Sequence, residues 1–201
     1  MKLLVLVLFN SLTRVLIRYI KTVYSLLYSY YISMEFKSIS DGYIFESPVI
    51  LKGAKYITIG KGFSPRARLR IEAWDSYNGN IHKPTIIIGD NVVLNFDCHI
   101  GAINFIQIGN DVLIGSNVLI TDHNHGKITT EELKLPPASR PLYSKGPVII
   151  EDNVWIGENV AILPNVRIGR NSIIGANSVV SSDVPENSVV GGIPAKVIKQ
   201  L

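Results

Sequence analysis

The segment ITDHNHG, residues 120–126, holds two histidines two residues apart, with a carboxylate directly before the first. An imidazole near its ordinary pKa can accept a proton from a hydroxyl group at neutral pH, so His123 or His125 could act as a general base. Closely spaced histidines can also bind a zinc ion. A polar, solvated loop is the third interpretation. The choice between them depends on which elements hold the two side chains.

A six-residue repeat precedes and follows this segment. Aliphatic residues recur at every sixth position, glycine follows several of them, and turn-forming pairs that end in asparagine lie between them. Short strands joined by tight turns explain this period, because asparagine and glycine tolerate left-handed turn conformations. Stacked coils would bury one aliphatic side chain on each side. The three runs are Ile88, Leu94 and Ile100; Ile108, Ile114 and Ile120; and Ile150, Ile156, Ile162, Ile168, Ile174 and Val180.

Two breaks interrupt the period. The registers at Ile100 and Ile108 differ by two residues, which predicts an irregularity near residues 104–107. The repeat then stops after Ile120 and returns near Val148, and the prolines between them predict a long loop. We therefore predict an all-β fold: an N-terminal amphipathic helical segment over residues 1–40, a parallel β-helix over 41–185 with an active-site loop over 122–147, and a C-terminal tail over 186–201.

The N-terminal segment differs from the repeat. The apolar run Leu3–Phe9 is far shorter than the roughly 20 residues of a membrane span. A signal peptide is not expected either, because no small-residue cleavage site follows the run. Arg14, Arg18 and Lys21 lie on a different face from the apolar positions. Two interpretations stay open: a helix that caps the solenoid, or a helix in the plane of an anionic membrane through residues 1–35. The apolar positions are Leu12, Val15, Leu16, Tyr19, Val23, Leu26, Leu27 and Tyr30.

The composition excludes several classes of protein. A chain of 201 residues is long enough for one domain with its own core. The net charge of +4 is too small to indicate nucleic-acid binding, and no nucleic-acid-binding motif is present. The single cysteine, Cys98, excludes a disulfide within the chain, and we expect it to be a small buried side chain.

The motifs DHNHG, VWIG and GGIPAKVI, at their separations in this chain, resemble those of the hexapeptide-repeat acyltransferases. The chain is most similar to the sugar O-acetyltransferases of capsule, O-antigen and exopolysaccharide synthesis and to the maltose and galactoside O-acetyltransferases. The resemblance implies a left-handed β-helix with three hexapeptides per coil. It further implies a homotrimer with sites between subunits, acetyl-CoA as co-substrate without a metal, and direct transfer of the acetyl group to a sugar hydroxyl in a ternary complex.

The resemblance also implies roles for single residues. The essential histidine of the family stands where the loop leaves the coil, which is His123 here, and His125 is expected to support it. Asp122 could orient the imidazole, contact the acceptor or cap the turn. Tyr143 is placed in the loop, from which it could cover the acceptor. The predicted acceptor contacts are Asn95, Asp122, His125, Tyr143 and Trp155.

For acetyl-CoA, the resemblance implies a groove between adjacent subunits along the C-terminal coils. Small residues there would meet the pantetheine arm, and lysines would lie near the phosphates. Ser182 stands where relatives often carry lysine, so one phosphate contact is either missing or supplied by Arg170 or Lys199. The predicted cofactor contacts are Trp155, Gly157, Gly175, Ala176, Ser181, Ser182, Lys196 and Lys199.

The predicted acceptor is a sugar or glycan, either free or lipid-linked, and nucleic acid is not an expected partner. The enzyme is expected in the cytoplasm or peripherally on the inner face of the cell membrane. One alternative is a γ-type carbonic anhydrase, which would need three histidine ligands; the candidates are His99, His123 and His125, and His82 is the only other histidine. The short spacing of His123 and His125 does not match that class. A non-catalytic hexapeptide scaffold, or acetyl transfer to an amine, serine or xenobiotic acceptor, are further alternatives.

Overall fold

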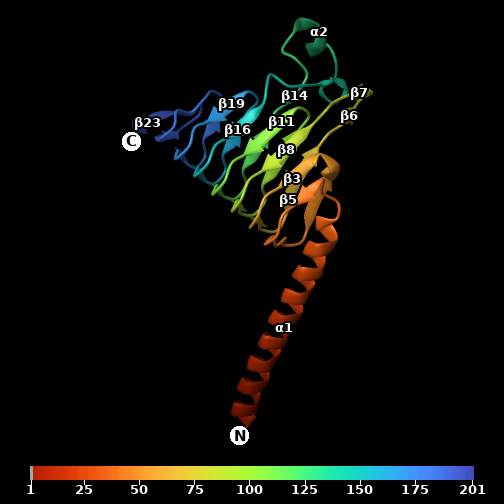
Figure 1. Ribbon diagram of the computed structural model, residues 1–201, viewed down its shortest axis with the longest axis vertical. Coiled ribbons are helices and arrows are strands. Elements are labelled where there is room, and N and C mark those ends of the chain that lie inside the picture. Colours follow the sequence, from red (N-terminus) through yellow and green to blue (C-terminus); the bar gives the residue numbers. More distant parts are fainter. Residues whose placement is uncertain (1) are drawn as a thin grey trace.

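The computed structural model describes residues 2–201, with side chains from residue 13 onward. A long helix, α1 (Lys2–Ser33), leads into a stack of triangular coils whose strands form three sheets, parallel throughout except for the last strand of the third (Figure 1). The predicted fold class is confirmed: a left-handed parallel β-helix with an N-terminal helical segment and a long excursion loop. Each sheet forms one side of the solenoid, and each coil adds one strand to it.

The strands lie in the three sheets in chain order. The first sheet contains β1 (Ser38–Ile39), β3 (Ile57–Ile59), β8 (Thr85–Ile88), β11 (Phe105–Ile108), β16 (Val148–Ile150) and β19 (Val166–Ile168). The second contains β2 (Val49–Lys52), β5 (Leu69–Ala73), β10 (His99–Ala102), β13 (Leu119–Thr121), β18 (Ala161–Ile162) and β21 (Val179–Val180). The third contains β4 (Ser64–Pro65), β9 (Val93–Leu94), β12 (Leu113–Ile114), β17 (Trp155–Ile156), β20 (Ile173–Ile174), β22 (Ser188–Gly191) and β23 (Lys196–Gln200).

The six-residue period builds the core as predicted. The six aliphatic residues of the last run are at most 1% exposed. Asparagines 153, 159, 165, 171 and 177 take up positive φ angles between 56° and 64°, so each coil turns at an asparagine in the left-handed conformation. Cys98 is 1% exposed, which confirms the expectation of a buried side chain, and burial raises the pKa of its thiol to about 11.

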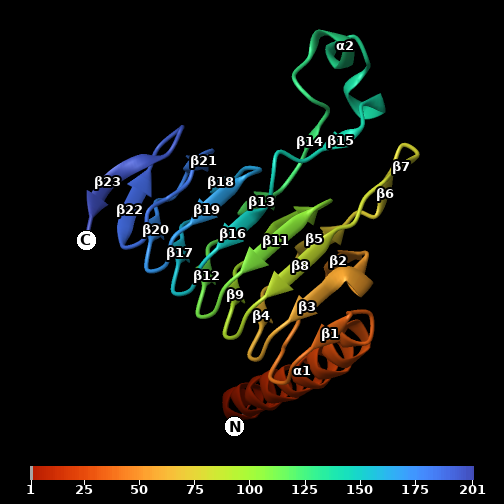
Figure 2. The ribbon, with the colours of Figure 1, turned by 45° about the horizontal axis from the view of Figure 1, so that its top comes forward.

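Two excursions leave the coils between the second and first sheets, and Figure 2 shows them side by side. The predicted loop contains β14 (Asn124–His125), α2 (Thr130–Leu133), the 3₁₀ turn Pro137–Ser139 and β15 (Leu142–Tyr143). An earlier hairpin, β6 (Ser76–Tyr77) with β7 (Asn80–Ile81), has no counterpart in the sequence-based prediction. The Tyr77 hydroxyl and the Asn78 amide both donate hydrogen bonds to the Ala138 carbonyl, so the two excursions hold each other.

The two ends of the solenoid are formed by different elements. The 3₁₀ turn Ala54–Tyr56 and the last turns of α1 cover the first coil, where Ile32 and Phe36 join the core. The Ser29 hydroxyl accepts a hydrogen bond from Phe45 N at 2.8 Å. At the other end β22 continues the third sheet in parallel with β20, and β23 turns back antiparallel to β22.

The apolar run Leu3–Phe9 and Leu12 lie outside the side chains that the structure describes. Within the described residues, no helix is both long enough and apolar enough to cross a bilayer.

Candidate active site

His123 lies two residues beyond the end of β13, at the point where the long loop leaves the coil. Its Nδ1 lies 2.9 Å from Asp122 Oδ1, and its side chain is 14% exposed. A carboxylate can only accept, so Nδ1 must carry the proton. The Nε2 atom is then the basic nitrogen of the neutral ring, and the rigid strand behind it fixes the direction in which the ring can act.

Asp122 is fully buried. Besides His123, its Oδ1 accepts a hydrogen bond from Ile103 N at 2.9 Å, and its Oδ2 accepts one from Asn104 N at 2.8 Å. These two amides belong to the preceding coil, directly after β10, at the corner where the six-residue register shifts. The carboxylate therefore caps that corner and orients the imidazole, and its fully buried position leaves no surface for an acceptor.

The His123 pocket is a hollow of about 250 Å³ on the outer face of the second sheet. His123 and His125 are the sequence-predicted site residues in its lining. Sequence reasoning missed most of the others as site residues. The pocket is lined by Arg70, Glu72, Trp74, Tyr77, His99, Gly101, Thr121, His123, His125 and Leu142.

A charged cluster forms the floor of the His123 pocket. The Glu72 side chain is 8% exposed, and its Oε2 lies 2.8 Å from Arg70 Nη2 and 3.4 Å from His99 Nε2. Burial, followed by the charge of Arg70, lowers the pKa of His99 below its ordinary value, so His99 is neutral at neutral pH. A nearly buried carboxylate beside a neutral imidazole offers hydrogen-bond partners to a polyhydroxylated ligand.

Gly101 separates the two imidazoles of the pocket. A β-carbon at this position would lie 3.4 Å from His99 Nε2 and 3.5 Å from His123 Cε1. Gly101 is in register with Glu72 on one side and Thr121 on the other, so all three lie on the same outward row of the second sheet. The missing side chain leaves room beside His123 for a reacting hydroxyl.

The two excursions form the aromatic wall of the pocket. The rings of Tyr77 and His125 meet edge to face, with centroids 5.5 Å apart. Trp74 packs against Tyr77 in the same way, and the Lys52 ammonium lies over the Trp74 ring. Tyr143 pairs with Asn124 in the hairpin of the long loop, beside the pocket but outside its lining. His125 therefore contributes its ring to the aromatic wall, whereas His123 is held by a hydrogen bond to the buried Asp122 carboxylate.

A second hollow of about 360 Å³, the Trp155 groove, lies on the third sheet. Trp155 is 52% exposed there, and its strand neighbours on the same face are Leu113 and Ile173. Five of the predicted site residues meet in this groove. Its lining consists of Asn95, Leu113, Gly115, Trp155, Gly157, Glu158, Ile173, Ile174, Gly175 and Ala176.

Coil stacking explains part of this lining. A β-carbon on Gly157 would lie 2.7 Å from Ala176 N, so this position must be glycine for the coils to pack. The Asn95 amide donates to the Ile114 carbonyl at 3.1 Å, which ties it to the next coil. Ala176 is exposed, and it is the position in the groove where a larger side chain would add bulk without disturbing the core.

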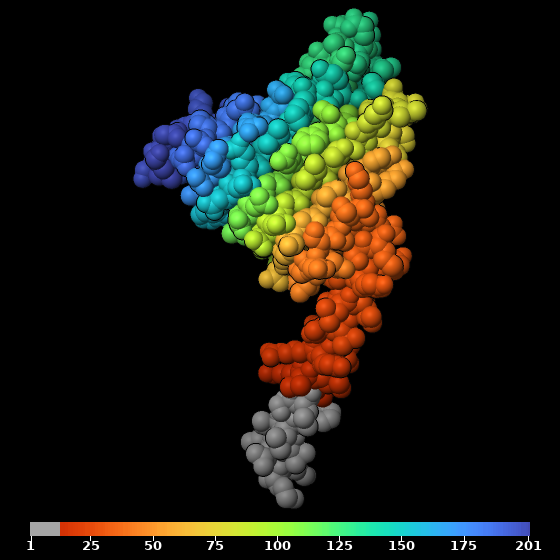
Figure 3. Space-filling model, viewed as in Figure 1, coloured from red at the N-terminus to blue at the C-terminus, as the bar shows by residue number. Residues whose placement is uncertain are grey.

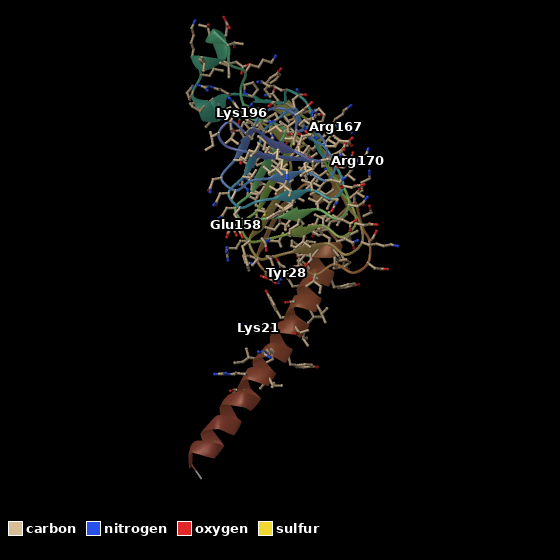
Figure 4. The ribbon with its side chains drawn as sticks, turned by 90° about the vertical axis from the view of Figure 1, so that its left-hand side faces the viewer. Lys21, Tyr28, Glu158, Arg167, Arg170 and Lys196 are labelled. Carbon is tan, nitrogen blue, oxygen red and sulfur yellow. The ribbon has the colours of Figure 1, made fainter. Side chains whose placement is uncertain are left out.

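The remaining predicted cofactor contacts lie around the groove or beyond it. Lys196 and Lys199 are exposed on β23, in the same sheet as Trp155, and Ser181 and Ser182 are exposed directly after β21. Arg170 pairs with Glu186 at 3.1 Å. Figure 4 shows Arg167 and Arg170 on the opposite side of the solenoid from Glu158, which lines the groove.

The His123 pocket and the Trp155 groove lie on different sides of the solenoid. Among the described residues they share no lining residue. Within one chain, the candidate base is therefore separated from the groove, which contains four of the eight predicted cofactor contacts. Among the same described residues, no group of three or more histidine, cysteine, aspartate or glutamate side chains is placed to hold a metal ion.

Comparison with known proteins identifies the family. The family described as bacterial transferase hexapeptide (six repeats) matches residues 147–182. The Escherichia coli (strain K12) protein WbbJ, named for lipopolysaccharide biosynthesis O-acetyl transfer, is 39% identical over 161 residues, which are 78% of each protein. The chain belongs to the hexapeptide-repeat transferases. Both the predicted family and the predicted enzyme class, an acyltransferase, are confirmed.

Two further relatives extend the comparison. Galactoside O-acetyltransferase of Escherichia coli (strain K12) is 40% identical over 126 residues, and the match covers 63% of this hexapeptide-repeat transferase but only 57% of that protein. The solved structure of galactoside acetyltransferase in complex with coenzyme A has a TM-score of 0.55 and 30% identity, over 84% of this chain and 67% of that chain. The Bacillus cereus N-acyltransferase AntD, at a TM-score of 0.70 and 18% identity over 86% and 88%, shares the fold.

Proposed function

We propose that this hexapeptide-repeat transferase moves the acetyl group of acetyl-CoA to a sugar hydroxyl of a surface polysaccharide or its precursor. The observation that carries the proposal is the Asp122–His123 pair, whose buried carboxylate holds Nδ1 and leaves Nε2 as the base beside an open pocket. The names of WbbJ and galactoside O-acetyltransferase support the O-acetyl chemistry, and the solved complex of galactoside acetyltransferase with coenzyme A supports the donor.

In the proposed mechanism, His123 removes the proton from the acceptor hydroxyl as its oxygen attacks the thioester carbonyl. The new bond joins that oxygen to the acetyl carbon, and the bond from this carbon to the CoA sulfur breaks. The proton then passes from the imidazole to the departing thiolate. Asp122 stabilises the imidazolium that forms between the two proton transfers. A backbone N–H directed at the carbonyl oxygen would stabilise the tetrahedral intermediate.

The acceptor would lie over the floor of the His123 pocket. Glu72 and His99 would bind hydroxyl groups of the sugar, and Trp74 would contact its apolar face. Gly101 leaves the space between the two imidazoles in which the reacting hydroxyl would sit.

We also propose that the working unit is a homotrimer in which the Trp155 groove of one subunit faces the His123 pocket of the next. The separation of the two hollows within one chain supports this arrangement, since neither hollow alone offers both a base and a long channel for the donor. Lys196 and Lys199 on β23 would then lie near the phosphates of CoA. Lipid-linked glycan precursors are assembled at the inner face of the cell membrane, and we place the enzyme there as a peripheral protein.

The test of the proposed function uses purified protein, labelled acetyl-CoA and two acceptors: polysaccharide of the source strain from which O-acetyl esters have been removed, and free galactosides. We expect label in an alkali-labile ester of the polysaccharide. Alkali-stable label would indicate an amine acceptor. Transfer to neither acceptor would contradict the proposed acceptor class.

A further inference from the structure

Helix α1 extends away from the solenoid for much of its length. Every residue from 14 to 24 is exposed, around the whole circumference of the helix. In Figure 3 the described part of the helix stands clear of the coils, and in Figure 4 Tyr28 lies at its junction with the solenoid while Lys21 lies beyond it. An isolated helix of this kind needs a partner surface, because so much apolar area in water is unfavourable.

One face of α1 carries its polar side chains. Arg14, Arg18, Lys21, Ser25 and Ser29 follow one another in steps of three and four residues, which places them in one row. Ser29 is also the residue that contacts the first coil, where it is 2% exposed. The row of cations therefore continues the side of the helix that faces the solenoid.

The opposite face is apolar and faces away from the protein. Leu16 is 57% exposed, Ile20 57% and Leu27 66%, and they mark the middle of this face. Tyrosines flank it, as is common where a protein meets the headgroup region of a membrane. The exposed apolar side chains of the helix are Val15, Leu16, Ile17, Tyr19, Ile20, Val23, Tyr24, Leu26, Leu27, Tyr30 and Tyr31.

The charge of the segment has one sign. Lys2, Arg14, Arg18 and Lys21 are its only charged side chains, and the first acidic residue is Glu35, beyond the end of the helix. A row of cations with no acidic neighbour is complementary to a surface of lipid phosphates. The apolar face is also wider than the narrow seam through which coiled-coil helices pair.

We propose that α1 lies on the surface of an anionic bilayer. Leu16, Ile20 and Leu27 enter the boundary of the acyl chains, and Arg14, Arg18 and Lys21 bind lipid phosphates. Because these cations share their side of the helix with Ser29, the solenoid stands on the aqueous side. The inference deepens the peripheral location given under the proposed function, but it holds for any acceptor, so a failure to bind vesicles would leave the proposed transfer reaction untouched.

The test is co-sedimentation of the full-length protein with vesicles of phosphatidylcholine alone or with phosphatidylglycerol at three parts in ten. We expect binding to the anionic vesicles that weakens at high salt. The triple variant R14Q/R18Q/K21Q should bind them roughly 100-fold more weakly, given the attraction of each cation to an anionic surface. The variant L16Q/I20Q/L27Q, which keeps good helix formers, should also lose binding.

The matched control is K37Q/K61Q/K134Q, which removes the same number of charges from exposed positions outside the helix. It should bind within about twofold of the wild type if the attraction is local to α1. Equal binding of the wild type and both helix variants, or equal loss in the control, would overturn the proposal. A third outcome would also overturn it: the wild type does not bind vesicles, and L16Q/I20Q/L27Q differs from it in oligomeric state. That result would assign the apolar face to contact with a second copy of the chain.

Discussion

Replacing His123 with alanine should lower kcat for acetyl transfer by roughly 10²–10⁴-fold, the usual effect of removing a general base. The His123 imidazole lines the pocket at the start of the long loop. Its Nδ1 is bound to Asp122, which leaves Nε2 as the basic nitrogen. The acceptor hydroxyl would then have to lose its proton to water. Steady-state kinetics with acetyl-CoA and the polysaccharide acceptor would measure the loss.

Two measurements separate this role from a structural one. His123→Ala should bind CoA with an unchanged Kd, because none of the predicted donor contacts lines the His123 pocket and four of them line the Trp155 groove on another sheet. Added imidazole should restore part of the lost rate, since the pocket is large enough to admit it. Near-wild-type turnover of the variant would remove His123 from the mechanism.

Replacing Asp122 with asparagine should lower both activity and stability. An asparagine amide has only one acceptor oxygen, so its NH2 group would face either Asn104 N or both Ile103 N and His123 Nδ1. With the imidazole in the wrong tautomer, we expect kcat to fall roughly 10²-fold or more. The unsatisfied buried donor should lower the free energy of unfolding by about 1–3 kcal/mol, measurable by urea denaturation.

Asp152→Asn provides the control for this substitution. Asp152 Oδ1 also accepts a backbone hydrogen bond at a coil corner, from Asn110 N at 2.7 Å, but it is exposed and lies outside the His123 pocket. Its replacement should leave kcat unchanged. A loss of stability without loss of kcat in Asp122→Asn would show that the carboxylate only caps the corner.

The repeated part of the fold was predictable because each coil follows the same local rules. An aliphatic residue every sixth position and an asparagine at each turn specify the inward row and the left-handed corners, and both appear as expected from Ile150 to Val180. The hairpin of β6 and β7 was not predictable in this way. It interrupts the repeat with residues that carry no period, and it is held by a contact to Ala138, which is about 60 residues away in the chain.

The site was predictable only where a motif marks it. His123 stands at the end of the repeat, but Glu72, His99 and Gly101 join it through the register of the second sheet, one and two coils earlier. The hairpin lengthens one of those coils, so the spacing from Glu72 to Gly101 does not follow the hexapeptide count. The buried Asp122 carboxylate accepts hydrogen bonds from Ile103 N and Asn104 N at an irregular corner of the preceding coil. The register shift between Ile100 and Ile108 predicts this irregular corner, but it does not predict that Asp122 caps it.

The central claim is that one active site combines the His123 pocket of one subunit with the Trp155 groove of the next. Subunit mixing tests it most directly. His123→Ala lacks the base, and Ala176→Trp fills the groove at an exposed position, so each variant alone should be nearly inactive. The two chains are co-expressed with different tags, and oligomers that carry both tags are purified.

If neighbouring subunits share sites, each mixed trimer contains one site with an intact base and an open groove, and activity should return to about one third of the wild-type value. Mixed oligomers as inactive as the separate variants would mean that base and groove must come from the same chain, which would contradict the account.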